Sequence, residues 1–585
     1  MFSTCCPKGS SFFLPENVKI VMNIMEVEMK KGKSTGAKAL VHTLEKMGVE
    51  VIFGYPGGAN LPIYGALQGS SIKHILARHE QGAAHMADGY ARVTGKVGIC
   101  LATSGPGATN LVTGIATAYM DSSPVLAITG QVPSTLIGND AFQEVDITGI
   151  TIPITKHNYL VQSASDIGPT VEEAFFLADS GRKGPVLIDI PKDILSSEFN
   201  INDEKKYTLE GYNPTIQGHP GQIKKAAALI KASEKPVIIA GGGVFHSDAF
   251  EVLQNFVEKS GIPLVHSLMG KSSMDSKHPL NYGLYGYHGS VAANTAIIKS
   301  DLIIAIGTRF GDRSTGPLAT YARDAKIIHI DIDPAEISKN VSVFIPIVGN
   351  ARDILPKLTD LVSLKKIPEW IDMLNKTSEK HPLRAGGKEI SVPGALEVVK
   401  QVVKDAIIVT DVGRHQIFSA LYSDVHAGRT FLTSGGLGTM GFGLPAAIGA
   451  KVGAQSLSND RPVVLIAGDG GFTMTCQEII TAVEEKLPLI LIVMNDSSLG
   501  MIAQLQDEFY DGSFNISKLG NFVKFDKLAQ SMGALGYRTE TKDELTNAVQ
   551  DAVKSGKPCV IDCIIKEDAH VYPMVKGSDL LDLIE

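Results

Sequence analysis

Eleven short runs of apolar, mostly β-branched residues recur along the chain, and nearly all of them end in glycine, proline or aspartate. In chain order they are VEVIFGYPGG, VGICLATSGPG, PVLAITG, GPVLIDIP, KPVIIAGGG, DLIIAIGTRF, AKIIHIDID, DAIIVTDVG, RPVVLIAGDGG, LPLILIVMND and KPCVIDCII. Continuous apolar runs of this length are typical of parallel strands that are buried on both faces. Helical stretches and glycine-rich turns separate them. The sequence therefore predicts an α/β fold of doubly wound parallel sheets, in which ligands bind beyond the carboxyl ends of the strands.

The chain of 585 residues is too long for one ordinary domain, and its length predicts about three. Two polar stretches, at about 196–221 and 377–391, interrupt the strand pattern. The expected organisation is an irregular extension at 1–33, domains at 34–200, 215–370 and 385–570, and a tail at 571–585. The first and third domains share a rhythm of strand, glycine turn and helix, which suggests a duplicated architecture.

The composition argues against several classes of protein. The formal net charge is −8 without long runs of like charge, so the chain has no basic footprint for nucleic acid. No run reaches the roughly 18 to 20 apolar residues that span a bilayer. Six cysteines, two of them adjacent at Cys5 and Cys6, form neither a disulfide framework nor a CxxC metal motif. Because the extension at 1–33 also has no arginine and no clear signal sequence, we expect a reducing, cytoplasmic compartment.

Two aspartates end neighbouring predicted strands in the segment GDGGFTMTCQEIITAVEEKLPLILIVMND. Asp469 stands in its Gly-Asp-Gly turn, and Asp496 follows 27 residues later. One right-handed crossover through a helix brings both carboxylates to the same sheet edge. Glycines and a helix start admit a phosphate, and oxygen ligands beside it suit a hard cation such as Mg²⁺. The alternative is that Asp469 caps a helix and Asp496 belongs to a turn.

A single glutamate is the second candidate, in RHEQGAAHMADGYARVTG at 78–95. Glu80 follows the strand-like IKHILA and opens a helix that is rich in alanine and glycine. Small apolar neighbours could desolvate the carboxylate and raise its proton affinity, which suits acid–base work. The alternative is an ordinary acidic residue that interacts with the helix dipole.

Six glycines and no charged residue occupy LTSGGLGTMGFGLPAAIGA, at 432–450. A flexible linker would not contain the helix-forming LPAAIGA, so we expect the backbone here to approach a flat or bent ligand closely. Met440 is a soft, adaptable side chain that could shape such a pocket, although a lone methionine is usually part of a core.

With these three segments, the sequence resembles the thiamine diphosphate (ThDP) enzymes, and among them the catalytic subunits of the acetohydroxyacid synthase (acetolactate synthase) family. The resemblance covers about 35 to 580 and includes YPGGANLPIY, SGPGATNLVTGIATAYMDSSPVLAITGQVP, DAFQEVDITGITIPITKHNYLV, SGRKGPVLIDIPKD, DVGRHQIF, GMIAQLQDEFY and HVYPMV. It implies a pyrimidine-binding domain, a central FAD-type domain and a diphosphate-binding domain, in that order.

The resemblance implies a ThDP–Mg²⁺ site whose metal ligands are Asp469, Asp496 and the carbonyl of Ser498. The residues expected at ThDP are Glu80, Gly413, His415, Gly438, Met440, Gly470, Gly471 and Met501. Glu80 would hydrogen-bond the pyrimidine ring across a subunit interface, so a dimer is the smallest active unit. Gln143 and Lys192 would line the approach to the active site as further catalytic residues.

The resemblance also implies that the central domain binds FAD, which this family uses structurally. The expected contacts are Arg182, Gly241, Gly242, Gly243, Ser267, Leu268, His288, Gly307, Arg309, Asp312, Arg313, Asp331, Ile332 and Asn350. GTRFGDRSTG is the most specific segment among them.

The implied activity is that of an acetolactate synthase in branched-chain amino acid biosynthesis. Pyruvate is decarboxylated on ThDP, and the hydroxyethyl carbanion joins a second pyruvate, or 2-oxobutyrate; with pyruvate the products are 2-acetolactate and CO₂. The expected partners are these 2-oxo acids, further copies of the chain in a homodimer or tetramer, and optionally a regulatory small subunit.

One alternative is another ThDP enzyme, namely a 2-oxo acid decarboxylase, an acetyltransferase or a flavin oxidase. The other is a non-catalytic nucleotide-binding protein on the same scaffold.

Four departures from the family pattern bear on these expectations. Asp496 stands where the family usually has asparagine, and it remains a competent ligand for a hard metal. Leu505 replaces a tryptophan that favours 2-oxobutyrate, so we expect a preference for pyruvate. Gly311 and Asn350 replace aspartates in the FAD region. Arg414 replaces a glutamine and adds a positive charge beside the diphosphate.

Overall fold

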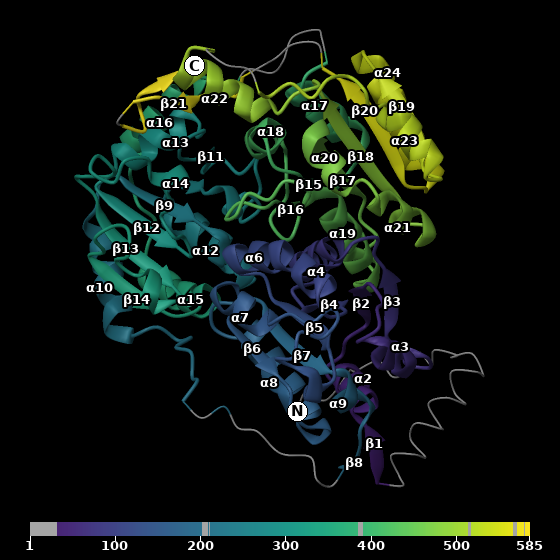
Figure 1. The fold of residues 1–585 in the computed structure, drawn as a ribbon. Coiled ribbons are helices and arrows are strands. Elements are labelled where there is room, and N and C mark those ends of the chain that lie inside the picture. Colours follow the sequence, from purple (N-terminus) through teal and green to yellow (C-terminus); the bar gives the residue numbers. More distant parts are fainter. Residues whose placement is uncertain are drawn as a thin grey trace, which may run out of the picture.

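The computed structural model describes residues 32–201, 209, 211–383, 390–512, 516–565, 570–577 and 579–584. The chain forms three α/β domains, each built on a six-stranded parallel sheet (Figure 1). The predicted extension at 1–33, apart from its last two residues, lies outside the described residues, and so do Cys5 and Cys6.

The first sheet has the strand order β3-β2-β4-β5-β7-β6. Its strands are β2 (Val51–Gly54), β3 (Lys73–Leu76), β4 (Gly98–Ala102), β5 (Val125–Gln131), β6 (His157–Leu160) and β7 (Val186–Pro191). The central strands β2, β4, β5 and β7 are buried along their whole length, as their apolar runs predict.

The third sheet repeats this topology in the order β16-β15-β17-β18-β20-β19. Its strands are β15 (Ile407–Thr410), β16 (Phe431–Leu432), β17 (Val463–Gly468), β18 (Leu489–Asn495), β19 (Leu535–Thr539) and β20 (Cys559–Ile564). When the strands are numbered within each domain, both sheets have the order 2-1-3-4-6-5. The duplicated architecture suggested by the sequence is therefore confirmed.

The middle sheet has the order β11-β10-β9-β12-β13-β14, which is 3-2-1-4-5-6 within the domain and is the order of dinucleotide-binding folds. Its strands are β9 (Pro236–Ala240), β10 (Leu264–His266), β11 (Asn281–Leu284), β12 (Leu302–Ile306), β13 (Lys326–Asp331) and β14 (Ile345–Val348). All eleven apolar runs of the sequence analysis form strands of these three sheets, so the predicted fold class is confirmed.

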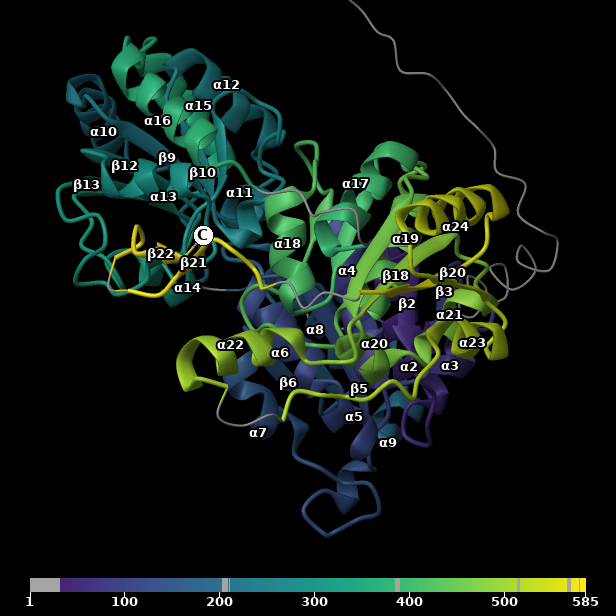
Figure 2. The same ribbon diagram turned by 90° about the horizontal axis from the view of Figure 1, so that it is seen from above.

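Helices connect the strands and cover the sheets (Figures 1 and 2). In the first domain they are α2 (Gly36–Lys46), α3 (Leu61–Leu67), α4 (Glu80–Thr94), α5 (Pro106–Asn110), α6 (Val112–Asp121), α7 (Ile147–Thr151), α8 (Ile167–Asp179) and α9 (Lys192–Ser196). In the middle domain they are α10 (Pro220–Ala232), α11 (Gly242–His246), α12 (Phe250–Ser260), α13 (Val291–Ile298), α14 (Asp312–Thr315), α15 (Ala351–Leu361) and α16 (Pro368–Lys380). In the third they are α17 (Val392–Val402), α18 (Arg414–Tyr422), α19 (Gly443–Ser456), α20 (Asp469–Thr475), α21 (Glu478–Glu484), α22 (Gly500–Tyr510), α23 (Phe525–Ser531) and α24 (Lys542–Ser555).

Helix α4 of the first domain packs against helix α19 of the third, and both are almost fully buried. A β-carbon at Gly89 would collide with the carbonyl oxygen of Ala446, and one at Gly449 would collide with that of Met86. The glycines of α19 therefore allow two helices to approach closely. The prediction that this segment serves a ligand is wrong for its helical part and stays a prediction for the loop that carries Gly438.

Two short antiparallel pairs complete the fold. β1 (Lys33–Thr35) pairs with β8 (Glu198–Asn200), and β21 (Met574–Val575) pairs with β22 (Leu583–Ile584). The second pair lies on the middle domain, where the N–H of Val575 donates to the carbonyl of Tyr287 at 2.9 Å (Figure 2). In the part of the chain that the structure describes, no helix is both long enough and apolar enough to cross a membrane.

Candidate active site

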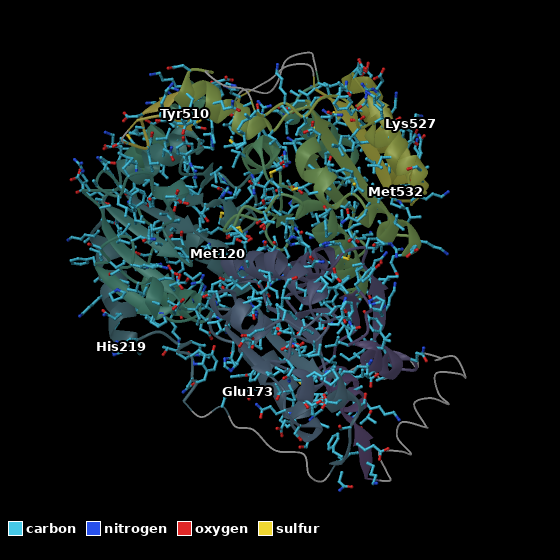
Figure 3. The ribbon with its side chains drawn as sticks, viewed as in Figure 1. Met120, Glu173, His219, Tyr510, Lys527 and Met532 are labelled. Atoms are coloured by element: carbon cyan, nitrogen blue, oxygen red, sulfur yellow. The ribbon has the colours of Figure 1, made fainter. Side chains whose placement is uncertain are left out.

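A large cavity of about 1290 Å³ lies at the carboxyl ends of the middle and third sheets. Its walls include the loops that follow β9, β10, β12 and β13 of the middle sheet and β15, β17 and β18 of the third. Met120 of α6 adds a wall from the first domain and lies close to the middle domain (Figure 3). Both sheets reverse their strand order at these loops, so the cavity lies where open α/β sheets bind ligands.

Two aspartates meet at the third-sheet end of this cavity. Strands β17 and β18 are neighbours, and their last residues in register are Gly468 and Met494. Asp469 is the first residue of α20, and Asp496 directly follows β18. Since Gly468 is the N-cap of α20, the alternative that Asp469 caps the helix is wrong.

Burial and the neighbouring Asp496 carboxylate raise the pKa of Asp469 to about 7. The backbone N–H groups of Gly470, Ser497 and Ser498 act in the opposite direction, which places Asp469 against the turn after β18. The two carboxylates therefore create a position that favours a cation.

The chemistry of these donors fits magnesium. The described residues contain no group of three or more His, Cys, Asp or Glu side chains that could hold a metal ion. Mg²⁺ typically uses only one or two protein carboxylates and completes its coordination with waters and phosphate oxygens. A pair of carboxylates beside a glycine-rich helix start thus suits a magnesium–diphosphate ligand.

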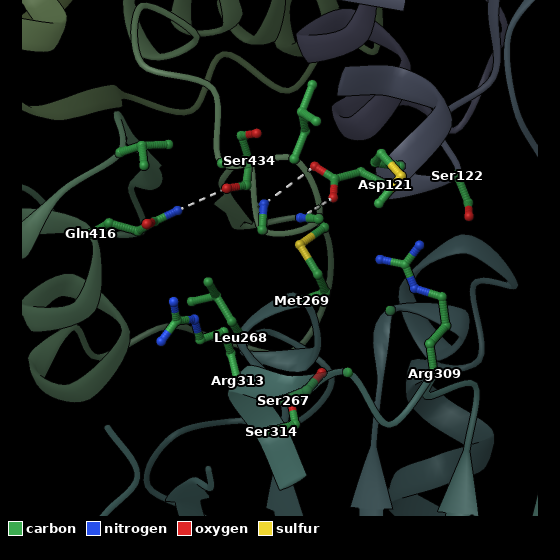
Figure 4. Close-up of a pocket in the computed structure, with 18 of the residues that line it drawn as sticks. Asp121, Ser122, Ser267, Leu268, Met269, Arg309, Arg313, Ser314, Gln416 and Ser434 are labelled. Atoms are coloured by element: carbon green, nitrogen blue, oxygen red, sulfur yellow. Dashed lines mark hydrogen bonds between the residues drawn. The ribbon is translucent and has the colours of Figure 1, made fainter. Parts of the chain in front are cut away.

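The glycine-rich loop after β16 is held by two buried aspartates that the sequence analysis did not single out. Asp411 accepts hydrogen bonds from the N–H groups of Gly441 at 3.1 Å and Gly443 at 2.9 Å. Asp121, at the end of α6, accepts one from the N–H of Gly436 at 2.6 Å (Figure 4). The position of Asp411 directly after an apolar strand was a usable signal, whereas nothing local marks Asp121. Two domains thereby fix the loop that carries Gly438 and Met440.

His415 presents a buried polar atom to the cavity. Its Nε2 has no hydrogen-bond partner among the described residues. Burial lowers the pKa of His415 to about 3, so the ring is neutral at physiological pH. Since buried polar groups in proteins are nearly always paired, this nitrogen indicates a polar ligand at this point.

A different set of charges lines the middle-sheet end. Arg182 forms ion pairs with Asp333 at 3.1 Å and with Glu336 at 2.9 Å, and Oε2 of Glu336 has no partner within the described ranges. Arg309 lies on the cavity wall (Figure 4), and burial followed by the nearby charge of Arg182 lowers its pKa. Such groups suit an extended anionic ligand that also carries hydroxyl groups.

Comparison with known proteins places all three domains in one enzyme family. Models of the thiamine pyrophosphate enzymes match the chain with their N-terminal TPP binding domain at 34–150, their central domain at 223–358 and their C-terminal TPP binding domain at 411–563. An acetolactate synthase large subunit of Corynebacterium glutamicum is 47% identical over 94% of this chain and 90% of its own length. The chain belongs to the acetolactate synthase family. A probable acetolactate synthase large subunit of Methanococcus aeolicus (45%, 94% and 95%) and an acetolactate synthase large subunit of Haemophilus influenzae (44%, 94% and 98%) are similarly close.

In this member of the acetolactate synthase family, most of the residues predicted to bind cofactors share one cavity. Its third-sheet end is lined by Gly413, His415, Gly438, Met440, Asp469, Gly470, Gly471, Asp496, Ser498 and Met501. Its middle-sheet end is lined by Arg182, Gly242, Gly243, Ser267, Leu268, His288, Gly307, Arg309, Asp312, Arg313, Asp331, Ile332 and Asn350. Figure 4 shows four of the latter, Ser267, Leu268, Arg309 and Arg313.

Gly241 is the exception among the predicted FAD contacts, because it does not line the cavity. A β-carbon at Gly241 would collide with the backbone of Gly307, so its small size serves the packing of two loops. Asp312 and Arg313 lie at the rim with side chains that are 88% and 72% exposed.

The three predicted catalytic residues do not line this cavity either. Glu80 is 8% exposed, opens α4 as predicted, and accepts a hydrogen bond from Nδ2 of Asn110 at 2.9 Å. The turn at 105–107 lies next to both Glu80 and Gln143. A β-carbon at Gly105 would collide with the backbone of Gln143, and one at Gly107 would come within 3.2 Å of the Glu80 carboxylate. Lys192 opens α9. In this acetolactate synthase family member, the glutamate and the two aspartates therefore lie at different places on one chain.

Proposed function

We propose that the chain is the catalytic subunit of an acetolactate synthase, which decarboxylates pyruvate and joins the remaining two-carbon unit to a second pyruvate. The products are 2-acetolactate and CO₂, at the first common step of branched-chain amino acid biosynthesis. The observation that carries the proposal is one cavity lined by both strand-end aspartates, in a chain similar over nearly its full length to acetolactate synthase large subunits.

Thiamine diphosphate fits the third-sheet end of the cavity. The residues that would hold it are Gly413, His415, Gly438, Met440, Gly470, Gly471 and Met501. The unpartnered Nε2 of His415 and the loop held by Asp411 support this placement. When bound, ThDP supplies the electron sink for decarboxylation. The chain's residues orient the cofactor and keep its surroundings dry.

We assign Mg²⁺ to Asp469, Asp496 and the carbonyl of Ser498. The support is the register of β17 and β18, which brings the two aspartates together, and the raised pKa of Asp469. A hard divalent cation would offset the repulsion between the carboxylates and favour the binding of a diphosphate beside them.

Glu80 would complete the active site of a partner subunit, because it does not line the cavity of its own chain. Its buried carboxylate, held by Asn110, is suited to donate and accept a proton at a ring nitrogen of the cofactor. Gln143 and Lys192 would line the same approach. We therefore propose a homodimer as the smallest active unit, which a second dimer or a regulatory small subunit can join.

FAD fits the middle-sheet end, where Glu336 and Arg309 offer an unpaired acceptor and a cation. The flavin would be structural, since the reaction has no net redox step. Neither departure in this region disturbs the local structure. A β-carbon at Gly311 would meet nothing within 4 Å, and Asn350 caps α15 by accepting from the N–H of Arg352 at 2.9 Å.

A cytoplasmic location is part of the proposal. The four cysteines in the described residues are Cys100, Cys476, Cys559 and Cys563, and none of them is in a disulfide. Free, mostly buried thiols are typical of a reducing compartment.

One preparation tests the proposed function. The protein is supplied with ThDP, Mg²⁺ and pyruvate, with and without 2-oxobutyrate, the products are identified, and a flavin spectrum is recorded. We expect one CO₂ for each 2-acetolactate, together with flavin absorbance. Acetaldehyde or acetyl transfer as the main product would identify another ThDP enzyme, and no pyruvate consumption would identify a non-catalytic scaffold. A spectrum without flavin would remove FAD from the proposal.

Leu505→Trp should move the choice of second substrate toward 2-oxobutyrate by about tenfold. Leu505 lies on α22 and lines the cavity, and an aromatic wall there would contact the additional methyl group, a difference of roughly 1–3 kcal/mol. The product ratio in a competition assay measures the effect. Phe509→Trp, on the same helix but outside the cavity lining, is the control. A wild-type enzyme that already strongly prefers 2-oxobutyrate would contradict the prediction.

A further inference from the structure

Arg414 is a buried cation at the third-sheet end of the cavity that the proposed cofactor contacts do not include. It is the first residue of α18, and its side chain is 7% exposed. A buried guanidinium is costly unless it is paired with an acceptor. Its partners therefore indicate what it does.

One acceptor of this guanidinium is an aspartate assigned to the metal. Nη2 of Arg414 donates to Oδ2 of Asp496 at 2.5 Å, across 82 residues of sequence. The other oxygen of Asp496 accepts from the N–H of Ser498 at 2.9 Å and from its hydroxyl at 2.8 Å. A carboxylate offers about four lone-pair sites, and three are used here. Asp496 is thus held in one orientation with one site left for a metal.

The fold makes room for this arrangement at Gly500, the first residue of α22. A β-carbon there would collide with the guanidinium of Arg414. Arg414 therefore lies between the turn after β18 and the start of α22, and any larger residue at position 500 would displace it.

The pair also changes the charge of the site. Two carboxylates facing a diphosphate repel it, and a guanidinium on one of them offsets that repulsion. We propose that Arg414 is a positioning residue. It holds Asp496 so that only one carboxylate oxygen is available to the metal, and it cancels the charge of Asp496. Asp496 can therefore serve as a second carboxylate, beside Asp469, where the metal and the diphosphate meet. This inference rests on the proposed ThDP–Mg²⁺ site.

Two binding measurements on the full-length protein test it without any assay of turnover. Mn²⁺ serves as a paramagnetic probe for Mg²⁺, and its affinity without ThDP is measured by electron paramagnetic resonance. The affinity for ThDP is measured calorimetrically at saturating Mg²⁺. In Arg414→Gln, Mn²⁺ should bind about tenfold more tightly, because a competing cation is gone. ThDP should bind about tenfold more weakly, because the repulsion is no longer offset.

A rise in Mn²⁺ affinity together with a fall in ThDP affinity would support the positioning role. If Arg414 had a merely structural role, the variant would bind both ligands more weakly. Arg414→Lys, which keeps the charge, should restore most of the ThDP affinity. The double variant R414Q/D496N, which removes both charges, should bring ThDP affinity back to within about threefold of wild type. Arg461→Gln is the matched control, since Arg461 pairs with Asp405 at 2.9 Å in the same domain and does not line the cavity.

The outcomes distinguish a failure of the proposed cofactor site from a failure of the positioning role of Arg414. If wild-type protein binds neither Mn²⁺ nor ThDP, the proposed cofactor site fails and the inference fails with it. If wild type binds both and Arg414→Gln leaves the affinities unchanged or weakens both, the positioning role is overturned while the cofactor site stands. Should Arg414→Gln not fold, the lysine and double variants decide the question by the same two affinities.

Discussion

Replacing Glu80 with glutamine is expected to lower acetolactate formation by about 10²- to 10⁴-fold, the usual contribution of a positioned acid or base. Glutamine preserves the shape and the hydrogen bond from Asn110 but cannot exchange a proton. Glu80 is 8% exposed at the start of α4, so its carboxylate is largely shielded from water. Product formation at saturating ThDP and Mg²⁺ measures the effect. Glu172→Gln, which alters an exposed ion pair with Lys46 in the same domain, should leave the rate unchanged.

The same variant tests the assignment of Glu80 to a partner subunit. Glu80→Gln and Asp469→Asn chains are each expected to be inactive alone. When they are mixed and reassociated, half of the dimers carry one intact site out of two, so about a quarter of the wild-type activity should return. Unchanged activity in Glu80→Gln would refute the catalytic role. No recovery in verified mixed dimers would refute the shared site.

Replacing Asp469 with asparagine is expected to weaken the binding of ThDP with Mg²⁺ by at least about 100-fold. Among the residues that the structure describes, Asp469 supplies one of the two carboxylates at the proposed metal position. Its loss removes a ligand charge that neither the Ser498 carbonyl nor the diphosphate can replace. Calorimetric titration with ThDP at fixed Mg²⁺ measures the change. Asp551→Asn, an exposed aspartate on α24 of the same domain, is the control.

The ionisation of Asp469 with pH distinguishes the loss of a metal ligand from damage to the fold. Its pKa of about 7 in the folded protein lies above the ordinary 3.8, so metal-free protein takes up a proton on folding and loses stability as pH rises from about 4 to 7. Metal binding needs the carboxylate, so metal affinity should fall up to about tenfold per pH unit below 7. Asp469→Asn should therefore bind metal poorly and yet, without metal, have a higher Tm than wild type at pH 8. A lower Tm would contradict this account.

The central strands could be predicted from the sequence, whereas several edge strands could not. Central strands such as β17 and β18 are buried on both faces and must be apolar along their length. Edge strands are partly exposed or very short: β6 is exposed at both ends and β16 has two residues. β10 lies inside its sheet, but it has only three residues. A short or half-exposed strand does not need a continuous apolar run, so its sequence carries little signal.

The glycine-rich segment shows a second limit of local patterns. A glycine that admits a ligand and a glycine that admits another helix both permit close approach, and the sequence around them looks alike. Gly449 serves the contact between α19 and α4, while Gly438 lines the cavity. Only the position of the neighbouring domain distinguishes them.

The sequence by itself determined the parallel α/β fold, the two aspartates at one sheet edge and the family. Each follows from order along the chain, because apolar runs specify buried strands and parallel strands end at the same edge. The tertiary structure alone decided that the predicted cofactor residues share one cavity, that Glu80 lies outside it, and that Arg414 holds Asp496. These contacts join residues far apart in sequence, and the packing of whole domains and the paths of their loops set which side chains meet.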